Sequence, residues 1–295
     1  MDDVIVIGGS FAGLAAALQV ARARRHVTVL DTGMPRNRFA RHAHGVLGQD
    51  GQSPSTILDA GRRQLLEYST AKIVETRAKT VRAEDDVFRI ETEGGVLSAR
   101  RLVLAYGIRD DLPELPGLAE CWGISVLHCP YCHAHEFGDR KLGIIMSTEH
   151  SIPAARMLQD WSPDVTLFTD GKPLDDEARR RLADWNIPVI EDALTEIVHD
   201  EGRMEAVRLS SGKSVPLDAT FIHTRHAPSC DLALQLGCEM EDGALGPFVV
   251  VGEGQETSVP GVYAAGDLAW QSHNISWAMA HGASAGIAAH QSLIS

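Results

Sequence analysis

The chain opens with an apolar run that predicts a buried strand over residues 4–7, because apolar side chains on both faces of a strand need cover on both sides. A glycine-rich turn follows, and an alanine-rich stretch then predicts a helix over residues 12–24. A second apolar run at 27–30 ends at Asp31. Strand, helix and strand in this order predict a βαβ unit within a parallel sheet.

The later pattern divides into two groups of elements. Between them, residues 111–117 contain two prolines and a glycine, which mark a crossing between domains. The strand–helix–strand order that follows the break echoes the opening unit. The expected elements before the break are a helix at 55–68, β segments between 72 and 97 and a strand at 101–105; those after it are a strand at 141–146, a helix at 152–161, strands at 164–168, 188–190, 206–209 and 219–223, a strand and turn at 260–267, and a final helix at 275–293.

We therefore predict an α/β fold with two Rossmann-like, dinucleotide-binding-type domains, the second inserted in the first. The first domain is expected at 1–112 and again at 246–295, where the chain returns to it. The central domain is expected at 113–245.

Composition and charge narrow the function. The chain of 295 residues is 44% hydrophobic and 23% charged, which is ordinary for a globular protein, and its net charge of -13 argues against nucleic acid or an anionic membrane as a partner. The acidic N-terminus does not resemble a signal peptide, and no stretch approaches 18 apolar residues, so we expect a cytoplasmic protein. Five cysteines, an odd number, do not fit a secreted disulfide scaffold.

The turn after the first strand carries a dinucleotide-binding pattern. Gly8 permits the tight turn, Gly13 allows close packing of helix on strand, and the helix N-terminus points unpaired N–H groups at a pyrophosphate. Asp31, about 20 residues on, is placed to accept hydrogen bonds from a ribose. Ser10 replaces the middle glycine and is small enough to keep the backbone approach open. The candidate cofactor residues of this turn are Gly8, Gly9, Ser10, Phe11, Ala12 and Gly13.

A second segment, Gly261–Asp267, resembles the second FAD motif of the flavin disulfide reductases. That resemblance implies that Gly266 and Asp267 bind the cofactor, with the Asp267 carboxylate on the ribityl chain. Residues 274–280 are in turn similar to the tail of FAD-dependent dithiol oxidases, and that resemblance places Trp277, with Ala278 next to it, on the flavin side. An acid in this position can equally cap a helix. With both motifs present in the right order, we expect FAD as the cofactor.

Cys129 and Cys132 form a CxxC pair, for which three interpretations compete. The two can be buried free thiols. They can ligate a metal, with His133, His135 or the distant Cys230 and Cys238 as further ligands. They can also be a redox-active dithiol, which we favour because this spacing brings two sulfurs within bonding distance. We therefore expect no metal.

The order of FAD motif, central CxxC and second FAD motif resembles the low-molecular-weight thioredoxin reductase family over essentially the whole chain. In that family the second cysteine faces the flavin and the first exchanges with substrate, which implies these roles for Cys132 and Cys129. The family usually has an acid after the second cysteine, whereas this chain has His133, followed by His135 and Glu136. Histidine exchanges protons near neutral pH, so His133 or His135 is the candidate general acid–base.

The central domain departs from an NADPH-binding pattern. No glycine follows its first strand, and the side chains of residues 147–150 would crowd a pyrophosphate that Glu149 would also repel. Lys172 alone stands where a basic cluster is expected. These features resemble a branch of the family, the FAD-dependent dithiol oxidases of the gliotoxin and holomycin type, which keep FAD and a CxxC followed by histidine but lack an NADPH site.

The leading hypothesis is an FAD-dependent oxidoreductase that oxidises a dithiol to a disulfide through Cys129 and Cys132, with O2 as the acceptor. The first alternative is a thioredoxin reductase-type enzyme supplied by NADPH or by another donor such as ferredoxin. The second is a flavin-bearing redox sensor without turnover. Expected partners are a small-molecule dithiol or a thioredoxin-like protein, and the resemblance implies a homodimer. The sequence suggests no role for Cys121, Cys230 and Cys238.

Overall fold

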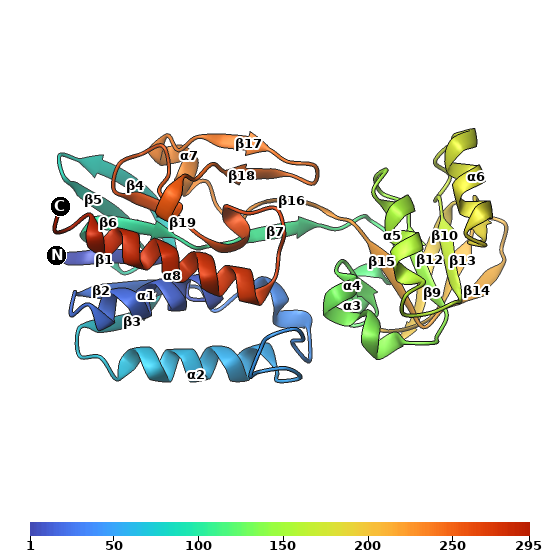
Figure 1. Ribbon diagram of the computed structural model, residues 1–295, viewed down its shortest axis with the longest axis horizontal. Coiled ribbons are helices and arrows are strands. Elements are labelled where there is room, and N and C mark those ends of the chain that lie inside the picture. The colour runs from blue at the N-terminus through green and yellow to red at the C-terminus, as the bar shows by residue number, and fades with distance from the viewer. The chain divides into compact units, whose positions relative to one another are not determined.

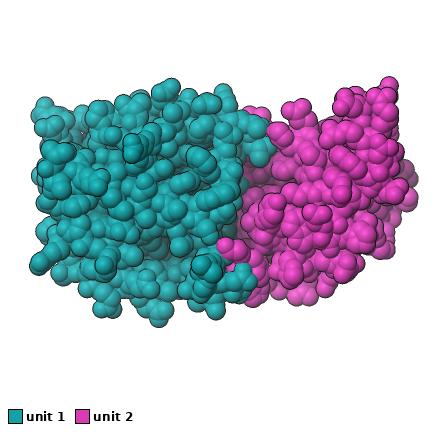
Figure 2. Space-filling view, in the orientation of Figure 1, with its two compact units in different colours: residues 1–38, 46–109, 226–295 teal, residues 39–45, 110–225 magenta.

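A computed structural model describes all 295 residues. The chain forms two compact units, shown in different colours in Figure 2. The first unit comprises residues 1–38, 46–109 and 226–295, and the second comprises 39–45 and 110–225. Each unit contains a parallel sheet with helices beside it, which confirms the predicted α/β class and the two-domain, dinucleotide-binding-type fold.

The return to the first unit comes earlier than the sequence predicts, after Arg225 rather than after residue 245. Strand β16 (Arg225–Pro228) pairs with β7 (Ile108–Asp111), so the two chain segments that link the units run together as a ribbon (Figure 1). Helix α7 (Leu232–Leu236) then buries apolar side chains in the first unit's core. Residues 39–45 belong to the second unit, which the sequence does not predict.

The first unit is built on a seven-stranded sheet in the order β3-β2-β1-β6-β5-β4, with β19 also paired to β6. Strands β1, β2, β3, β6 and β19 are mutually parallel, whereas β4 and β5 form an antiparallel extension. The bounds are β1 (Asp2–Ile7), β2 (Val27–Asp31), β3 (Ala71–Glu75), β4 (Ala78–Glu84), β5 (Val87–Thr92), β6 (Gly95–Leu104) and β19 (Val262–Ala264), with β17 (Met240–Asp242) and β18 (Pro247–Val249) as a separate hairpin.

Besides α7, three helices accompany this sheet: α1 (Phe11–Arg22), α2 (Pro54–Leu66) and α8 (Ile275–Gln291). Helix α8 lies against α1 (Figure 1), and small residues make the contact possible. A Cβ atom on Gly282 would lie 2.0 Å from the Ala12 carbonyl oxygen, and one on Gly286 would lie 2.3 Å from the Ala16 oxygen. The small-residue composition of α8 therefore serves close backbone packing. Short 3-10 turns are η1 (Arg36–Phe39), η3 (Glu253–Gln255) and η4 (Gly266–Leu268).

The second unit has a five-stranded parallel sheet in the order β11-β10-β9-β15-β8 and a separate antiparallel sheet, β12-β13-β14. The strands are β8 (Val126–Leu127), β9 (Leu142–Ile145), β10 (Val165–Phe168), β11 (Val189–Ile190), β12 (Leu194–Asp200), β13 (Arg203–Leu209), β14 (Ser214–Pro216) and β15 (Ala219–Ile222); the helices are α3 (Leu118–Cys121), α4 (Pro130–His133), η2 (Ala134–Phe137), α5 (Ser151–Leu158) and α6 (Asp176–Asp184).

Helix α6 is absent from the sequence-based prediction although it carries a local start signal. The Asp175 side chain accepts a hydrogen bond from the Ala178 N–H at 2.7 Å, as an N-cap residue does. Only Ala178 and Leu182 of the helix are buried. The highly charged segment therefore offers few apolar positions, and apolar positions are what the prediction relied on.

Candidate functional site

The turn between β1 and α1 is a backbone cradle that no larger residue could form. A Cβ atom on Gly13 would lie 1.8 Å from the Gly8 carbonyl oxygen, so only glycine lets α1 begin this close to the strand. Gly8 itself has φ +108, and a Cβ there would lie 2.3 Å from the Ala105 oxygen. The steric roles that the sequence suggests for these two glycines match the structure.

The backbone of Gly9 lies directly against the side chain of Asp31, at the end of β2. Its N–H donates to Asp31 Oδ1 at 3.2 Å, and an added Cβ would lie 2.6 Å from the Asp31 carboxyl carbon. Arg62 of α2 donates to the other oxygen, Oδ2, at 2.9 Å. The carboxylate is therefore fixed next to the cradle, held by a main-chain and a guanidinium donor.

Helix α1 presents its first turn to this cradle. Ser10 is its N-cap residue, but the Ser10 side chain makes no capping hydrogen bond. Phe11 and Ala12 are buried in the core behind the turn. A helix of this length with an uncapped N-terminus attracts an anion through its N–H groups and its dipole. The glycine cradle and this helix start fit the pyrophosphate of a dinucleotide.

The second motif lies against the first within the same unit. A Cβ on Gly266, whose φ is +74, would lie 2.9 Å from the Ala12 Cβ. The neighbouring Asp267 carboxylate is partly buried and pairs with Arg36, with Nη1 and Oδ2 3.0 Å apart. Arg36 Nη1 also lies 2.9 Å from His273 Nδ1. The acid of the second motif is thus embedded in a cationic environment.

The start of α8 is fixed by Asn274, whose Oδ1 accepts the Trp277 N–H at 2.7 Å. Trp277 is exposed, while Ala278 is half-buried and packs against the core. His281, one turn further along, meets the ring of Trp270 edge-on, with centroids 5.2 Å apart. Burial lowers the pKa of His281, against an opposing effect of the Asp267 carboxylate.

Cys129 and Cys132 form a disulfide in the second unit, with an S–S distance of 2.05 Å and Cα atoms 5.3 Å apart. Cys129 is the N-cap of α4, with Pro130 in the first turn, and the Cys132 N–H donates to the Cys129 carbonyl at 3.2 Å. Both cysteines are half-buried, whereas Tyr131 between them is 76% exposed. The Tyr131 ring meets Trp161 edge-on at 5.6 Å. A short turn thus presents the disulfide at the surface of the unit.

Four imidazoles lie around this turn or next to it in the sequence. His128 stacks on Trp122, with ring centroids 5.8 Å apart. His133 is half-buried, and burial lowers the pKa of its imidazole; Glu136 acts in the opposite direction, and His44 adds to the lowering. His135 is exposed. Burial thus favours the neutral form of the His133 imidazole, the form in which a histidine can accept a proton.

In the parallel sheet of the second unit, the turn after β9 lies where a nucleotide-binding turn is expected, and it differs from that pattern. Strand order reverses between β9 and β15, the place where α/β sheets bind ligands. The turn after β9 has no glycine, and its N–H groups are already bonded: Ser147 and Thr148 donate to the fully buried Ser151 Oγ at 3.2 and 3.5 Å. These donors are therefore turned toward the protein.

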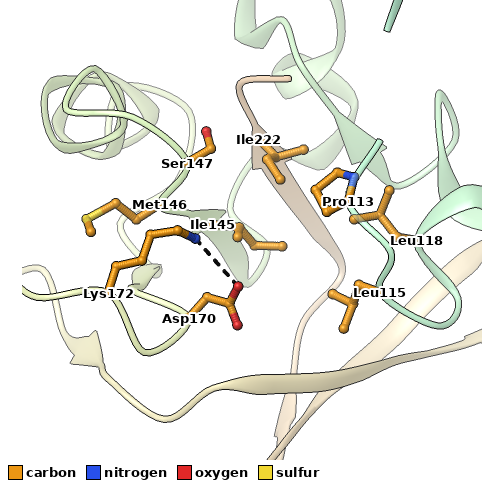
Figure 3. A pocket seen from close by; sticks show the side chains of 9 residues that line it. All are labelled: Pro113, Leu115, Leu118, Ile145, Met146, Ser147, Asp170, Lys172 and Ile222. Carbon is orange, nitrogen blue, oxygen red and sulfur yellow. Dashed lines mark ion pairs between the residues drawn. The ribbon is translucent and has the colours of Figure 1, made fainter. Parts of the chain in front are cut away.

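What remains at this edge is a small cavity of about 80 Å³ with mostly apolar walls (Figure 3). The Lys172 ammonium is already paired with a carboxylate, because its Nζ lies 3.5 Å from Asp170 Oδ2. The lining residues are Pro113, Leu115, Leu118, Ile145, Met146, Ser147, Asp170, Lys172 and Ile222. A cavity of this size holds only a few non-hydrogen atoms and is far smaller than a dinucleotide.

Nearly the whole sequence matches a known family. Residues 2–285 fit the family described as pyridine nucleotide-disulphide oxidoreductase. The chain belongs to this family. It is 30% identical to thioredoxin reductase sirT of Leptosphaeria maculans, covering 96% of this chain and 92% of that protein.

Solved structures of the same fold cover nearly the whole molecule. An oxidoreductase from Agrobacterium tumefaciens has a TM-score of 0.94 at 40% identity and covers 99% of this chain and 98% of its own. HlmI has a TM-score of 0.93 at 38% identity, with coverage of 99% and 92%. This oxidoreductase is therefore a thioredoxin reductase-like flavoenzyme that carries a CxxC pair, as the sequence predicts.

The structure adds residues to the site that the sequence did not single out. Arg62 and Arg36 hold the two motif carboxylates, His44 pairs with Glu136, and Ser151 closes the turn after β9. None belongs to a motif, and each lies far in sequence from the residue it contacts or within an ordinary turn. For Arg36 and His44 the available signal was the abundance of Arg and His between residues 35 and 60, whereas Arg62 and Ser151 had none.

The three remaining cysteines are core residues. Cys121 and Cys238 are buried in separate apolar clusters, and Cys230 packs against the second of these. Burial raises the pKa of Cys230 to about 11 and raises the pKa of Cys121 and Cys238 as well. Protonated thiols are poor nucleophiles, so these cysteines are structural in this oxidoreductase.

Two further findings concern metals and membranes. No group of three or more His, Cys, Asp or Glu side chains is arranged to hold a metal ion. The protein also has no helix with the length and apolar character needed to cross a bilayer.

Proposed function

We propose that this oxidoreductase is an FAD-dependent dithiol oxidase that uses O2 as its acceptor. The observation that carries the proposal is the turn after β9, where Ser151 Oγ occupies the N–H groups of Ser147 and Thr148. A site for NADPH needs such groups free for phosphate. Without NADPH as the source of electrons, a dithiol is the donor that can reduce the Cys129–Cys132 disulfide.

FAD would be held by the cradle of Gly8, Gly9 and Gly13, by Ser10, Phe11 and Ala12 at the start of α1, by the carboxylates of Asp31 and Asp267, and by Gly266, Trp277 and Ala278. When bound, FAD supplies a two-electron acceptor for the reduced cysteine pair, with O2 as terminal acceptor and hydrogen peroxide as product. The steric cradle and the uncapped α1 N-terminus support this assignment.

The cysteine pair would carry out thiol–disulfide exchange in two steps. A substrate thiol gives its proton to His133 and attacks Cys129 Sγ; the S–S bond breaks, and Cys132 leaves as a thiolate. The second substrate thiol then attacks the mixed disulfide and releases Cys129. The substrate loses two electrons and two protons, the protein disulfide gains the electrons, and the substrate leaves as a disulfide. His135, which is exposed beside the turn, is the second candidate for proton exchange.

The partner would be a small-molecule dithiol, with a thioredoxin-like protein as the alternative, and the enzyme would act as a cytoplasmic homodimer. Tyr131, exposed between the two cysteines, offers an apolar ring beside the reacting sulfurs. Sedimentation of the flavin-loaded protein tests the dimer, with a single monomeric species as the opposing result.

An anaerobic titration of the flavin spectrum tests the proposed direction of electron flow. Dithiothreitol should bleach the oxidised flavin, whereas NADPH at the same concentration should leave it unchanged. On admitting air, the dithiol-treated sample should consume O2 and form hydrogen peroxide with repeated turnover. Rapid bleaching by NADPH would instead establish a reductase, and failure of every dithiol to bleach the flavin would overturn the proposal.

A further inference from the structure

A short segment far from the CxxC in sequence is part of the disulfide's unit. Residues 39–45 belong to the second unit, although the residues before and after them belong to the first. The segment is anchored by Phe39 against Gly123: a Cβ on Gly123 would lie 2.9 Å from the Phe39 Cβ, and Gly123 has φ +75. Ala43 is also buried, with 6% exposure. The packing of these residues fixes the path of the backbone that leads to His44.

The side chain of His44 in this segment contacts the carboxylate of a residue that follows the CxxC. Its Nε2 lies 3.3 Å from Glu136 Oε1, and the two side chains are 23% and 38% exposed. Glu136 lies in η2, one short turn after His133 at the end of α4. The ring of His42 lies beside that of His44, with centroids 6.3 Å apart. The chain therefore brings an imidazole from residues 39–45 to Glu136, which follows the candidate proton carrier His133 by three positions.

We propose that His44 is a positioning residue of the disulfide site, which holds the Glu136 carboxylate beside His133. Glu136, in turn, provides the negative charge that lets a half-buried imidazole take up a proton from an incoming thiol. The inference rests on the proposed role of His133 in proton exchange. It adds to the site a residue that lies more than 80 positions before the cysteines, in a segment that carries no motif.

The pKa of His133 distinguishes two roles for His44: holding Glu136 in place, or acting only as a nearby charge. Burial lowers the pKa of His133, the Glu136 carboxylate raises it, and His44 lowers it by charge repulsion. If His44 acted only as a nearby charge, its removal would raise the pKa of His133. If His44 holds Glu136 in place, its removal frees the carboxylate to turn toward water, and the pKa of His133 falls. The two roles predict shifts of opposite sign.

The test is a pH titration of the full-length, flavin-loaded protein, labelled with ¹³C at the histidine rings and followed by NMR. A His133→Gln variant identifies the His133 signal. His44→Ala should increase the acid dissociation constant of His133 by about threefold or more, and Glu136→Gln should shift it in the same direction. His44→Gln, whose amide can still donate to Glu136, should stay near wild type.

His26→Gln is the matched control, because His26 is an exposed histidine paired with Asp3 in the other unit. It should leave the His133 signal unchanged. An unchanged or raised His133 pKa in His44→Ala would overturn the proposal, as would a shift in His44→Gln as large as that in His44→Ala. The readout involves no turnover, so a failure of wild-type protein to oxidise dithiols would count against the proposed function alone.

Discussion

Arg36 and Asp267 are 231 positions apart in the sequence, yet Arg36 Nη1 donates to Asp267 Oδ2 at 3.0 Å. The pair is partly buried, with side-chain exposures of 16% and 22%, and Arg36 also lies within hydrogen-bond distance of His273. A loop after β2 and a turn after β19 are thereby joined at the proposed flavin site. The motif acid is not a free carboxylate, because its charge is already compensated by the chain.

Replacing Arg36 by methionine should leave the Asp267 carboxylate partly buried without its cation. We expect a loss of about 1–3 kcal/mol in the free energy of unfolding, the usual cost of an unpaired buried polar partner, and a lower flavin content. Denaturant unfolding and the flavin-to-protein absorbance ratio measure both. Arg38→Met, two residues away on an exposed side chain, is the control and should change neither. Equal losses in both variants would contradict a specific role for the pair.

Gly282→Ala should disturb the contact between α1 and α8. The new Cβ would lie 2.0 Å from the Ala12 carbonyl oxygen, so the helices must separate, at a cost of about 1–3 kcal/mol. Because Ala12 lies in the first turn of α1, flavin retention should fall together with the melting temperature. In the control, Gly61→Ala, the Cβ would lie 3.3 Å from the Leu14 Cδ1, the flexible end of a side chain. A Gly282→Ala protein with wild-type melting would show that this contact is looser than described.

Cys129→Ser and Cys132→Ser should each abolish dithiol-dependent peroxide formation, because either change removes one sulfur of the disulfide through which the electrons pass. Flavin binding should persist, since the cradle lies in the other unit. Cys230→Ser is the control, because burial keeps the Cys230 thiol protonated with a pKa of about 11. Peroxide formation at the wild-type rate in either CxxC variant would remove the pair from the reaction.

Dithiol oxidation should depend on pH through His133. A general base acts in its neutral form, and burial lowers the pKa of His133, so the rate should rise with pH, with a midpoint below the ordinary histidine value of about 6.5. His133→Ala should lower the plateau by about 10²–10⁴-fold, the usual contribution of a positioned acid–base group. A rate profile of the wild type and the variant from pH 5 to 8 measures this. An unchanged plateau in His133→Ala would leave His135 as the proton carrier.

Stability should also fall in acid. The pKa of His133, His223 and His281 is lowered by burial in the folded protein, so each takes up protons more readily when unfolded. The unfolded state binds more protons below about pH 6.5, and the free energy of unfolding must decrease as pH falls through that value. Thermal melting between pH 5 and 8 measures the effect. A flat profile across this window would contradict the burial of these imidazoles.

Ser151→Ala should destabilise the second unit, because the N–H groups of Ser147 and Thr148 both donate to the buried Ser151 hydroxyl. We expect a cost of about 1–3 kcal/mol from donors left without an acceptor. Ser55→Ala, on the exposed start of α2, serves as the control. The variant should still fail to oxidise NADPH, because the missing glycine and the Asp170–Lys172 pair are unchanged. Strong NADPH oxidation by the variant would show that Ser151 alone excludes the nucleotide.

Much of the architecture was readable from local patterns. The apolar strands β1, β2, β9, β10 and β15 and the helices α1, α2, α5 and α8 were predicted within a few residues, because each buries a continuous or periodic apolar face. The weakly apolar α6 and the short α7 were missed. The inserted domain was expected, but its end was placed too late, since the short apolar segment at 232–236 does not reveal which of the two cores it enters.

The sequence by itself determined the chemistry of this oxidoreductase, because the glycine turn, the CxxC and the second acidic turn each require particular residues at fixed local spacing. Only the tertiary structure decided what holds that chemistry in place: Arg62 on Asp31, Arg36 on Asp267, and His44 on Glu136. These are contacts between single charged side chains distant along the chain. A charged residue has the same local pattern whether it faces water or a partner, so only the folded backbone determines which of them meet.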